Sequence, residues 1–383
     1  MGTILDYMEW RGDLSFEASP FNEVDNLIFS WMSYVELKEI VPGRMGLWMS
    51  LKDVAEIYKR THDFEADKKM VIITKTAPNF FVEMGKVKRY QDVKLGFFRS
   101  KIDMKQEAQF AAVTVQISSD LIFVAYRGTD QSIVGWKEDF NMAYLEQVPS
   151  QLEALDYLSK VAEKWKGTII LGGHSKGGNL AIYAGVHAAP EVQEQIAGIY
   201  NNDGPGFSPA MLEKTAYQKM LPKIHTYVPQ SSIVGMLLEH AEGYRIVKSS
   251  HKGIMQHDAL SWEVTGPHFV EMENTTLASQ FADATLTSWL TTMDNAQREE
   301  FVELLFSVLD STGARTLTDL TSGALKNISV ILKTLGGLTK EEKNRLLSAV
   351  TQLFKAGNAM LKKQIEEEFP ELLSHSSGKK EHD

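Results

Sequence analysis

The sequence predicts an α/β fold in which a mainly parallel sheet is flanked by helices and followed by a helical C-terminal region. Two observations lead to this prediction. Between about residues 168 and 247, short apolar runs typical of buried strands alternate with amphipathic or small-residue runs typical of helices. After about Thr276 the strand-like runs stop and only helical stripes follow. A length of 383 residues suits one large domain with an appendage, or two domains.

Composition excludes several classes of protein. The chain has 40 basic and 50 acidic side chains, a formal net charge of −10, which disfavours sequence-independent nucleic-acid binding because that binding needs Lys and Arg on phosphates. It contains no cysteine, so disulfides, thiolate metal sites and a cysteine nucleophile are excluded. No basic segment followed by an apolar one opens the chain, and no run approaches the ~20 apolar residues of a membrane span. We therefore expect a soluble, cytoplasmic protein without a signal peptide.

The first part of the chain predicts a helix and then strands. Residues 21–41 mix apolar and acidic side chains at helical spacing, which predicts a helix covering the main domain. Residues 93–98 predict a strand. Residues 109–116 and 121–126 flank a Ser-Ser-Asp turn and predict a β-hairpin.

The alternating part predicts four strands and four helices. The predicted strands cover residues 168–171, 196–200, 223–228 and 244–247. The predicted helices cover residues 151–165, 179–189, 209–220 and 232–239. Strands that alternate with helices of this length indicate a mainly parallel sheet with helices on both faces.

The C-terminal part predicts three helices. The first carries an apolar stripe over 301–309 and ends near Gly313, and the second covers 317–335. The third begins at a capping box formed by Thr339 and Glu342 and runs towards residue 365. We therefore divide the chain into an α/β domain with an N-terminal helical cover (1–275), a helical region (276–373) and a polar tail expected to be disordered (374–383).

The most specific motif is G-x-S-x-G, formed by Gly173, Ser175 and Gly177. It lies between an apolar strand and a small-residue helix, which is the setting of a nucleophile elbow. In such a turn the serine backbone is strained, and side chains at both glycine positions would clash with the strand and the helix. The following helix directs positive dipole potential and free N–H groups towards the serine. Ser175 is therefore a candidate nucleophile, and this context disfavours the alternative of a purely steric turn.

A serine nucleophile needs a base and an orienting acid, which follow it in the order acid, then histidine. The acid commonly follows the second strand after the nucleophile strand, which here is the strand over 223–228. No carboxylate lies between that strand and Glu239, so the usual position of the acid is empty. One strand earlier, Asp203 follows the end of a strand in a glycine-rich turn and is the candidate acid. A role in capping this turn is its alternative.

Three histidines after the last strand of the alternation are candidate bases. His257 precedes an apolar segment, where a loop histidine can fold back over the sheet edge, and we prefer it. His251, among small polar residues, is the second choice, and His268 leads towards the helical region. His174 adjoins the nucleophile, but its side chain is expected to point away from Ser175 and to pack.

An oxyanion hole needs a second donor from an earlier loop. The backbone N–H of Thr129, helped by its hydroxyl, is expected to pair with the N–H of Lys176 around a developing negative oxygen. Arg127 is expected to anchor this loop. Core packing is favoured for the aromatic side chains of Trp136 and Phe140.

These motifs resemble a known family. Residues 126–129 (Tyr-Arg-Gly-Thr) and 173–181 (Gly-His-Ser-Lys-Gly-Gly-Asn-Leu-Ala) are similar to the class 3 lipase pattern of the α/β-hydrolase superfamily. They are more similar still to a little-characterised bacterial branch, the Mbeg-like family, which has Lys rather than Leu after the serine. Residues 202–207, 232–236 and 256–258 also resemble that branch.

The resemblance covers roughly residues 21–266 and implies an α/β-hydrolase fold for them. It implies Ser175 as nucleophile, His257 as base and Asp203 as acid. The chain departs from class 3 lipases at Ser232, where those enzymes have an aspartate.

The leading hypothesis is a serine hydrolase that cleaves carboxylic esters, including lipid esters, through an acyl-enzyme and without a cofactor or metal. A thioesterase or acyltransferase with the same triad is one alternative. A non-catalytic scaffold on this fold, with the C-terminal helices binding a partner, is another. Residues 277–293 carry one charge, Asp283, so they suit a lid or a helix in peripheral contact with a membrane, or a helix packed on its own domain. The acyl chain, the leaving group and the oligomeric state stay open.

Overall fold

The computed structural model describes residues 2–70, 73–322, 324–349, 351–352 and 355. Its centre is a nine-stranded sheet in the order β1-β2-β3-β4-β5-β6-β7-β8-β11. Strands β4 to β8 run parallel, and the pairs outside them are antiparallel. The predicted fold class is confirmed. The strands of this sheet are β1 (Met49–Ser50), β2 (Lys94–Asp103), β3 (Ala108–Gln116), β4 (Leu121–Tyr126), β5 (Thr168–His174), β6 (Ile196–Asn202), β7 (Ile224–Pro229), β8 (Arg245–Val247) and β11 (Glu271–Met272).

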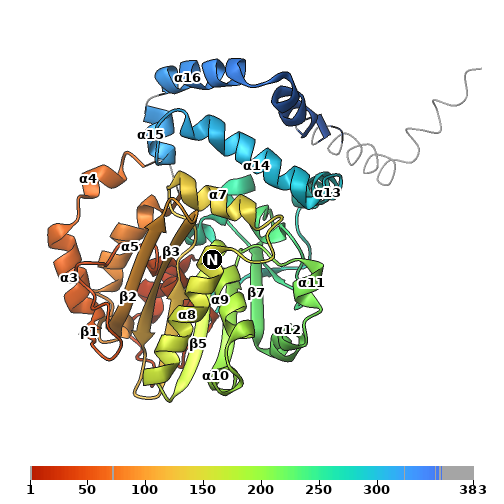
Figure 1. Ribbon diagram of the computed structural model, residues 1–383. Helices are drawn as coiled ribbons and strands as arrows, with labels where there is room; N and C mark the ends of the chain where they lie inside the picture. The colour runs from red at the N-terminus through yellow and green to blue at the C-terminus, as the bar shows by residue number, and fades with distance from the viewer. Residues whose placement is uncertain (1, 71–72, 323, 350, 353–354, 356–383) are drawn as a thin grey trace, which may run out of the picture.

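Helices cover both faces of the sheet (Figure 1). One face packs against α8, α9 and α12, around buried Tyr157 and Leu180. The other packs against the N-terminal helices, around buried Phe29 and Trp31. The helices up to β7 are α1 (Ile4–Arg11), α2 (Glu23–Met32), α3 (Leu51–Thr61), α4 (Phe64–Asp67), α5 (Ala77–Met84), α6 (Lys88–Gln91), α7 (Ile133–Asn141), α8 (Pro149–Lys164), α9 (Lys176–His187), α10 (Pro190–Gln195), α11 (Pro209–Leu212) and α12 (Thr215–Met220).

The predicted β-hairpin is confirmed as β3 and β4, whose register pairs Thr114 with Val124. Strand β2 extends further than predicted and pairs with β3. The interior strands are almost wholly buried, as expected for a sheet covered on both faces.

The predicted helix over 21–41 is wrong in its length. Helix α2 begins after Asn22, whose side chain accepts two backbone N–H groups, and it ends at Met32. All ten of its residues are buried. The chain then turns, which brings the Tyr34 hydroxyl 2.9 Å from His174 Nδ1 at the end of β5. Tertiary contact thus overrides a helical pattern that continues in the sequence.

The predicted helix over 232–239 is also wrong, because only a short 3-10 turn, η3 (Val234–Met236), is present. The Gly235 N–H at this turn donates to the Asp203 carboxylate at 3.2 Å and to Ser232 Oγ at 3.0 Å. Because the loop uses its backbone donor on side chains, it does not continue as a helix.

The C-terminal helices lie over the carboxyl ends of the strands, next to α7 (Figure 1). They are α13 (Leu277–Thr291), α14 (Asn295–Asp310), α15 (Leu317–Ser322) and α16 (Ala324–Gly337). The Phe306 ring of α14 lies 5.6 Å from the Phe140 ring of α7. The Ile133 N–H donates to Arg315 O at 2.9 Å, which ties the start of α7 to the segment between α14 and α15.

The capping box at Thr339 is confirmed, because the Glu342 carboxylate accepts the Thr339 N–H at 2.7 Å. The rest of the third predicted helix is only partly described, and the predicted tail over 374–383 lies outside the described residues. The domain division stays a prediction. None of the helices in the described ranges combines the length and apolarity that a membrane span requires.

Candidate active site

Ser175 lies in the turn between β5 and α9 with φ 57° and ψ −136°. This is a strained conformation for a non-glycine residue, as predicted for a nucleophile elbow. A Cβ added at Gly173 would lie 2.2 Å from Gly177 C, and one added at Gly177 would lie 2.1 Å from Tyr126 O. Both glycines are therefore required by close backbone approach.

The surroundings of Ser175 are tightly packed. The residue is only 9% exposed, and its N–H donates to Asn202 O at 2.9 Å. Helix α9 starts at the next residue, so its free N–H groups lie beside the serine. Among the described residues, Ser175 Oγ has no hydrogen-bond partner.

Asp203 lies just after β6 and is fully buried, with φ 55°. His257 Nδ1 donates to its Oδ2 at 2.6 Å. Its Oδ1 accepts hydrogen bonds from Ser232 Oγ and from the Gly235 N–H. These three donors satisfy both oxygens of the carboxylate and fix its orientation towards the imidazole.

Ser232 explains the carboxylate position that is empty in the sequence. It follows β7, one strand further from the nucleophile than Asp203. The end of β6 therefore supplies the carboxylate, and the end of β7 supplies a hydroxyl that donates to it. Sequence reasoning missed this contact, since a serine in a loop carries no distinguishing pattern.

Of the three candidate bases, His257 is the one that contacts Asp203 within the described part of the chain. His251 is exposed and lies 3.2 Å from Met255 O. His268 is exposed and lies 3.4 Å from Glu23 Oε1. The His257 side chain is 14% exposed, and the described residues provide no hydrogen bond between it and Ser175.

His174 contacts His257, the candidate base, directly, which the sequence did not predict. It is fully buried, and its Nε2 donates to the backbone carbonyl of His257 at 2.7 Å. Burial, together with the neighbouring His257, holds the pKa of His174 well below its usual value. The predicted packing role of this residue is therefore incomplete.

The loop after β4 brings Thr129 near the serine. A Cβ added at its neighbour Gly128 would lie 3.0 Å from Ser175 Cβ. The Thr129 hydroxyl donates to Asp139 Oδ2 at 2.5 Å, so its hydrogen is directed to a carboxylate rather than to the serine. Buried Arg127 anchors the loop, because its guanidinium contacts Glu36 at 3.3 Å.

Lys176 directs its side chain away from the serine and under α7. Its ammonium donates to Glu138 Oε2 at 2.9 Å and to Gln109 O at 3.1 Å, and all three side chains are buried. Asp139 Oδ1 lies 3.6 Å from the same ammonium. Burial lowers the pKa of Lys176, but the charges of Glu138 and Asp139 outweigh it and raise the pKa overall.

Burial raises the pKa of Asp139 to about 6, although Lys176 and Thr129 favour the charged form. Asp139 Oδ1 is buried without a hydrogen bond among the described residues. The core packing predicted for Trp136 and Phe140 is wrong, because they are 38% and 37% exposed. Phe140 instead packs against Phe306 of α14.

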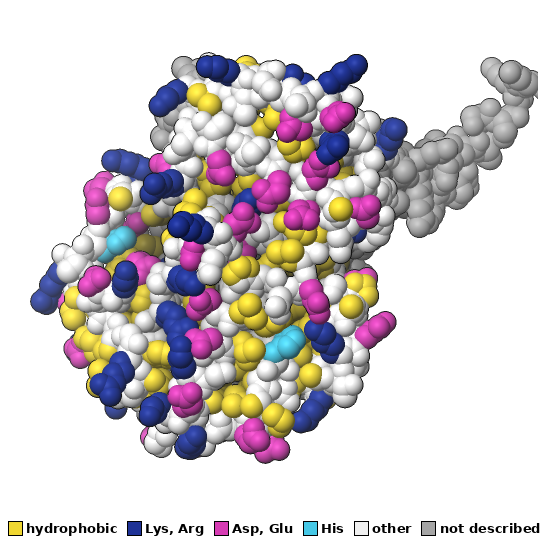
Figure 2. Space-filling model, viewed as in Figure 1, with side chains coloured by type: hydrophobic (Ala, Val, Ile, Leu, Met, Phe, Trp, Pro, Cys, Tyr) yellow, Lys and Arg dark blue, Asp and Glu magenta, His cyan; other side chains and the backbone are white. Residues whose placement is uncertain are grey.

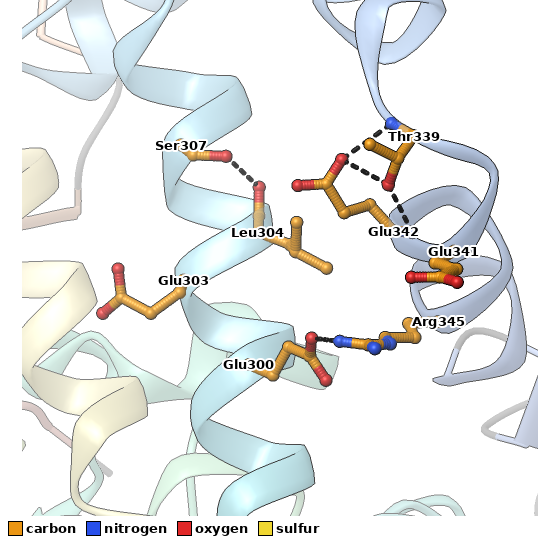
Figure 3. Close-up of a pocket in the computed structure, with 8 residues that line it drawn as sticks. All are labelled: Glu300, Glu303, Leu304, Ser307, Thr339, Glu341, Glu342 and Arg345. Carbon is orange, nitrogen blue, oxygen red and sulfur yellow. Dashed lines mark hydrogen bonds and ion pairs between the residues drawn. The ribbon is translucent and has the colours of Figure 1, made fainter.

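On the surface of the molecule, the charged side chains and one groove are the features to consider as a binding site. Figure 2 shows acidic and basic side chains interspersed over the face that carries α7 and α8. A groove of about 480 Å³ lies between α14 and the helical segment after Thr339. It is lined by Glu300, Glu303, Leu304, Ser307, Thr339, Glu341, Glu342 and Arg345, and an ion pair joins Glu300 to Arg345 across it (Figure 3). No predicted site residue lines this groove. The described residues contain no cluster of three or more His, Asp or Glu suited to a metal ion.

Comparison with known proteins gives a family and several distant structures. A fungal lipase–inhibitor complex shares 16% identity over 52% of this chain and 76% of its own, with a TM-score of 0.32. The Rhizomucor miehei lipase–propeptide complex shares 18% identity over 42% of this chain and 57% of its own, with a TM-score of 0.30. The M37 lipase shares 17% identity over 55% of this chain and 68% of its own, with a TM-score of 0.34.

At these identities and TM-scores, the similarity to the three lipases carries no argument about the activity of this chain. A search of curated proteins found no match. The model of the Mbeg1-like family matches residues 84–307, which is more than half of the chain and includes Ser175, Asp203 and His257. The chain therefore belongs to the Mbeg1-like family.

Proposed function

We propose that this protein is a serine hydrolase that cleaves carboxylic esters, including lipid esters, through an acyl-enzyme on Ser175. One observation carries the proposal: a buried carboxylate on Asp203 binds His257 Nδ1 at 2.6 Å, beside a strained serine at the start of a helix. A buried acid, an imidazole and a strained serine are the three parts that nucleophilic acyl transfer needs.

In this proposal Asp203 fixes the tautomer of His257. Because the carboxylate accepts a hydrogen bond from Nδ1–H, the hydrogen stays on Nδ1 and the lone pair on Nε2 is free to take the proton of the Ser175 hydroxyl. The serine oxygen then bonds to the ester carbonyl carbon, and the imidazolium returns its proton to the leaving alcohol. Water, deprotonated by the same imidazole, releases the acid and restores the serine.

The oxyanion formed in each step is held by the backbone N–H groups of Lys176 and Thr129. Lys176 is the first residue of α9, so its N–H has no partner inside the helix. The loss of one such donor typically costs about 3 kcal/mol in the barrier. No cofactor or metal enters this scheme.

A fluorophosphonate probe tests the nucleophile, because it phosphonylates only an activated serine. We expect it to label the wild type and the control variant Ser159→Ala, which changes an exposed serine on α8, and to spare Ser175→Ala. A panel of p-nitrophenyl esters of graded acyl length, with matched thioesters, then gives the substrate class. Labelling that persists in Ser175→Ala would remove Ser175 as the nucleophile.

One observation favours a second candidate, a non-catalytic binding protein on the same fold. Within the described residues no hydrogen bond joins Ser175 Oγ to His257. Such contacts often form only when substrate is bound, so the observation does not decide between the two functions. Correctly folded wild-type protein that neither reacts with the probe nor cleaves any ester of the panel would favour the binding protein.

A further inference from the structure

We propose that His174, oriented by Tyr34, is a positioning residue that holds His257 in place for proton transfer. The inference rests on the proposed function and adds to it a residue pair from outside the triad. Tyr34 also lies outside residues 84–307, the part of the chain that the family model matches.

The hydrogen bonds of His174 assign its tautomer. Nε2 lies 2.7 Å from the backbone carbonyl of His257, and a carbonyl oxygen only accepts, so Nε2 carries a hydrogen. In a neutral ring Nδ1 is then the acceptor, and the Tyr34 hydroxyl donates to it at 2.9 Å. The same hydroxyl also lies 3.3 Å from His174 O, so Tyr34 contacts both the ring and the backbone of His174 on the side away from His257 O.

Ring packing restrains both imidazoles. The centroids of His174 and His257 lie 4.5 Å apart with an interplanar angle of 39°. The rings of Trp31 and Tyr34 pack against the His174 ring in T-shaped geometry. Their centroids lie 5.2 Å and 5.8 Å from the His174 centroid. His174 is fully buried, so close packing restricts the motion of its ring and, through the ring contact, that of the His257 ring. His257 is therefore held at its backbone by a hydrogen bond, at its ring by packing, and at Nδ1 by Asp203.

The charge of His174 also matters for the base. A cation 4.5 Å from His257 would oppose the imidazolium that forms there during acyl transfer. Burial keeps the pKa of His174 well below its usual value, and the ring stays neutral while His257 takes up the proton. The Asp203 carboxylate is bound to Nδ1 of His257, so it favours a positive charge on His257.

The N-terminal helical cover places Tyr34 where this contact needs it. On α2, Asn26 exchanges hydrogen bonds with the Asn202 side chain, which itself donates to Gly173 O at 3.0 Å. These contacts are buried and tie the first half of α2 to the end of β5, just before Ser175. The N-terminal helices thus cover one face of the sheet and also supply Tyr34 to the candidate site.

Ester hydrolysis by three variants tests the proposal. His174→Gln retains an amide donor that can reach the His257 carbonyl, whereas His174→Met fills similar space without one. We expect kcat to fall about 10- to 100-fold in His174→Met, with KM within about twofold, a loss of the size seen when the outer hydrogen-bond partners of metal-binding imidazoles are removed. We expect His174→Gln to recover most of that loss and Tyr34→Phe to lose less than His174→Met. His187→Gln, at the far end of α9, is the matched control.

Two outcomes overturn the proposal. If His174→Gln loses as much kcat as His174→Met while both unfold at the wild-type temperature, the donor to His257 does not matter. If KM rises and kcat stays, His174 acts on substrate binding instead.

A second measurement needs no activity. In full-length Ser175→Ala protein, ¹⁵N shifts of the imidazole nitrogens report tautomers directly. We expect neutral His174 with its hydrogen on Nε2 at pH 7, and a change on Tyr34→Phe. A hydrogen on Nδ1, or a cation, overturns the inference. The expected tautomer together with failure of the probe to label Ser175 would instead leave the contact standing and reject the proposed function.

Discussion

The two sides of the candidate site are built on different electrostatics. On the base side, one buried carboxylate, Asp203, binds an imidazole, a hydroxyl and a backbone N–H, so each of its oxygens has a partner. On the oxyanion side, the buried ammonium of Lys176 forms ion pairs with the adjacent carboxylates of Glu138 and Asp139 on α7. Glu138 there has its partners, but Asp139 keeps a buried oxygen without a hydrogen bond among the described residues.

Because of this difference, substitutions on the two sides should affect different properties of the protein. In the proposed function the base side depends on the placement of one proton, so we expect a change there to act on catalysis. The oxyanion side depends on balanced buried charge, so a change there acts on stability and on its pH dependence. The predictions below test this division, beginning with the largest expected effect.

We expect Asp203→Asn to lower kcat by about 10⁴-fold, because an amide donor would favour the wrong tautomer of His257. The measurement is steady-state hydrolysis of the best p-nitrophenyl ester. Asp156→Asn, on the exposed side of α8, is the control. A loss of only a few fold would show that Asp203 is not the acid.

Moving the acid to the next strand should restore part of the activity. Because Ser232 Oγ already contacts the Asp203 carboxylate, an aspartate at 232 would lie near His257. We expect Asp203→Ser with Ser232→Asp to exceed Asp203→Ser alone in kcat by at least about 10-fold, as an ionised acid again orients the imidazole. Equal activity of the two proteins would mean that the end of β7 cannot serve His257.

Removing the buried ammonium should destabilise the fold. Lys176→Met leaves Glu138 charged and unpaired in the interior, and we expect a loss of about 3–5 kcal/mol in the free energy of unfolding. Lys176→Met with Glu138→Gln should lose less, because the charge of Glu138 is removed together with that of its partner. Denaturant unfolding of the wild type, Lys176→Met, Glu138→Gln and the double variant gives these values. A double variant as unstable as the sum of the single ones would argue against a coupled pair.

The smallest expected effect is a pH dependence from Asp139. Its pKa is raised from 3.8 to about 6, so the folded protein binds this proton more tightly than the unfolded chain. Stability from this residue is therefore present at low pH and is lost as pH rises from about 4 to about 6.

Asp139→Asn should remove that loss. The full shift corresponds to about 3 kcal/mol, but the side chain is 30% exposed and solvent screens it, so we expect a gain nearer 1 kcal/mol at pH 7 relative to pH 4. Thermal unfolding of both proteins across this pH range is the measurement. A constant difference between them would show that Asp139 does not titrate there.

Much of the fold could be predicted because local patterns carry it. The alternation of apolar runs and helical stripes predicted the strands from β5 to β8, and apolar runs around a turn predicted the hairpin of β3 and β4. The glycines of the elbow predicted the strained turn at Ser175. The helices over 21–41 and 232–239 were wrong, since contacts of Tyr34 and Gly235 with distant residues decide where those segments turn. The roles of Ser175, Asp203, His257, Thr129 and Lys176 stay predictions that the experiments above address.

By itself the sequence determined the α/β class, the position of the nucleophile turn and the residues able to serve it, because steric rules and hydrophobic period act over a few residues. Only the tertiary structure decided which of them meet. Ser232 reaches Asp203 across 29 residues, Lys176 reaches Glu138 across 38, and His174 reaches His257 across 83. Such contacts depend on how neighbouring strands end at one edge of the sheet, and no local pattern in the chain encodes that distance.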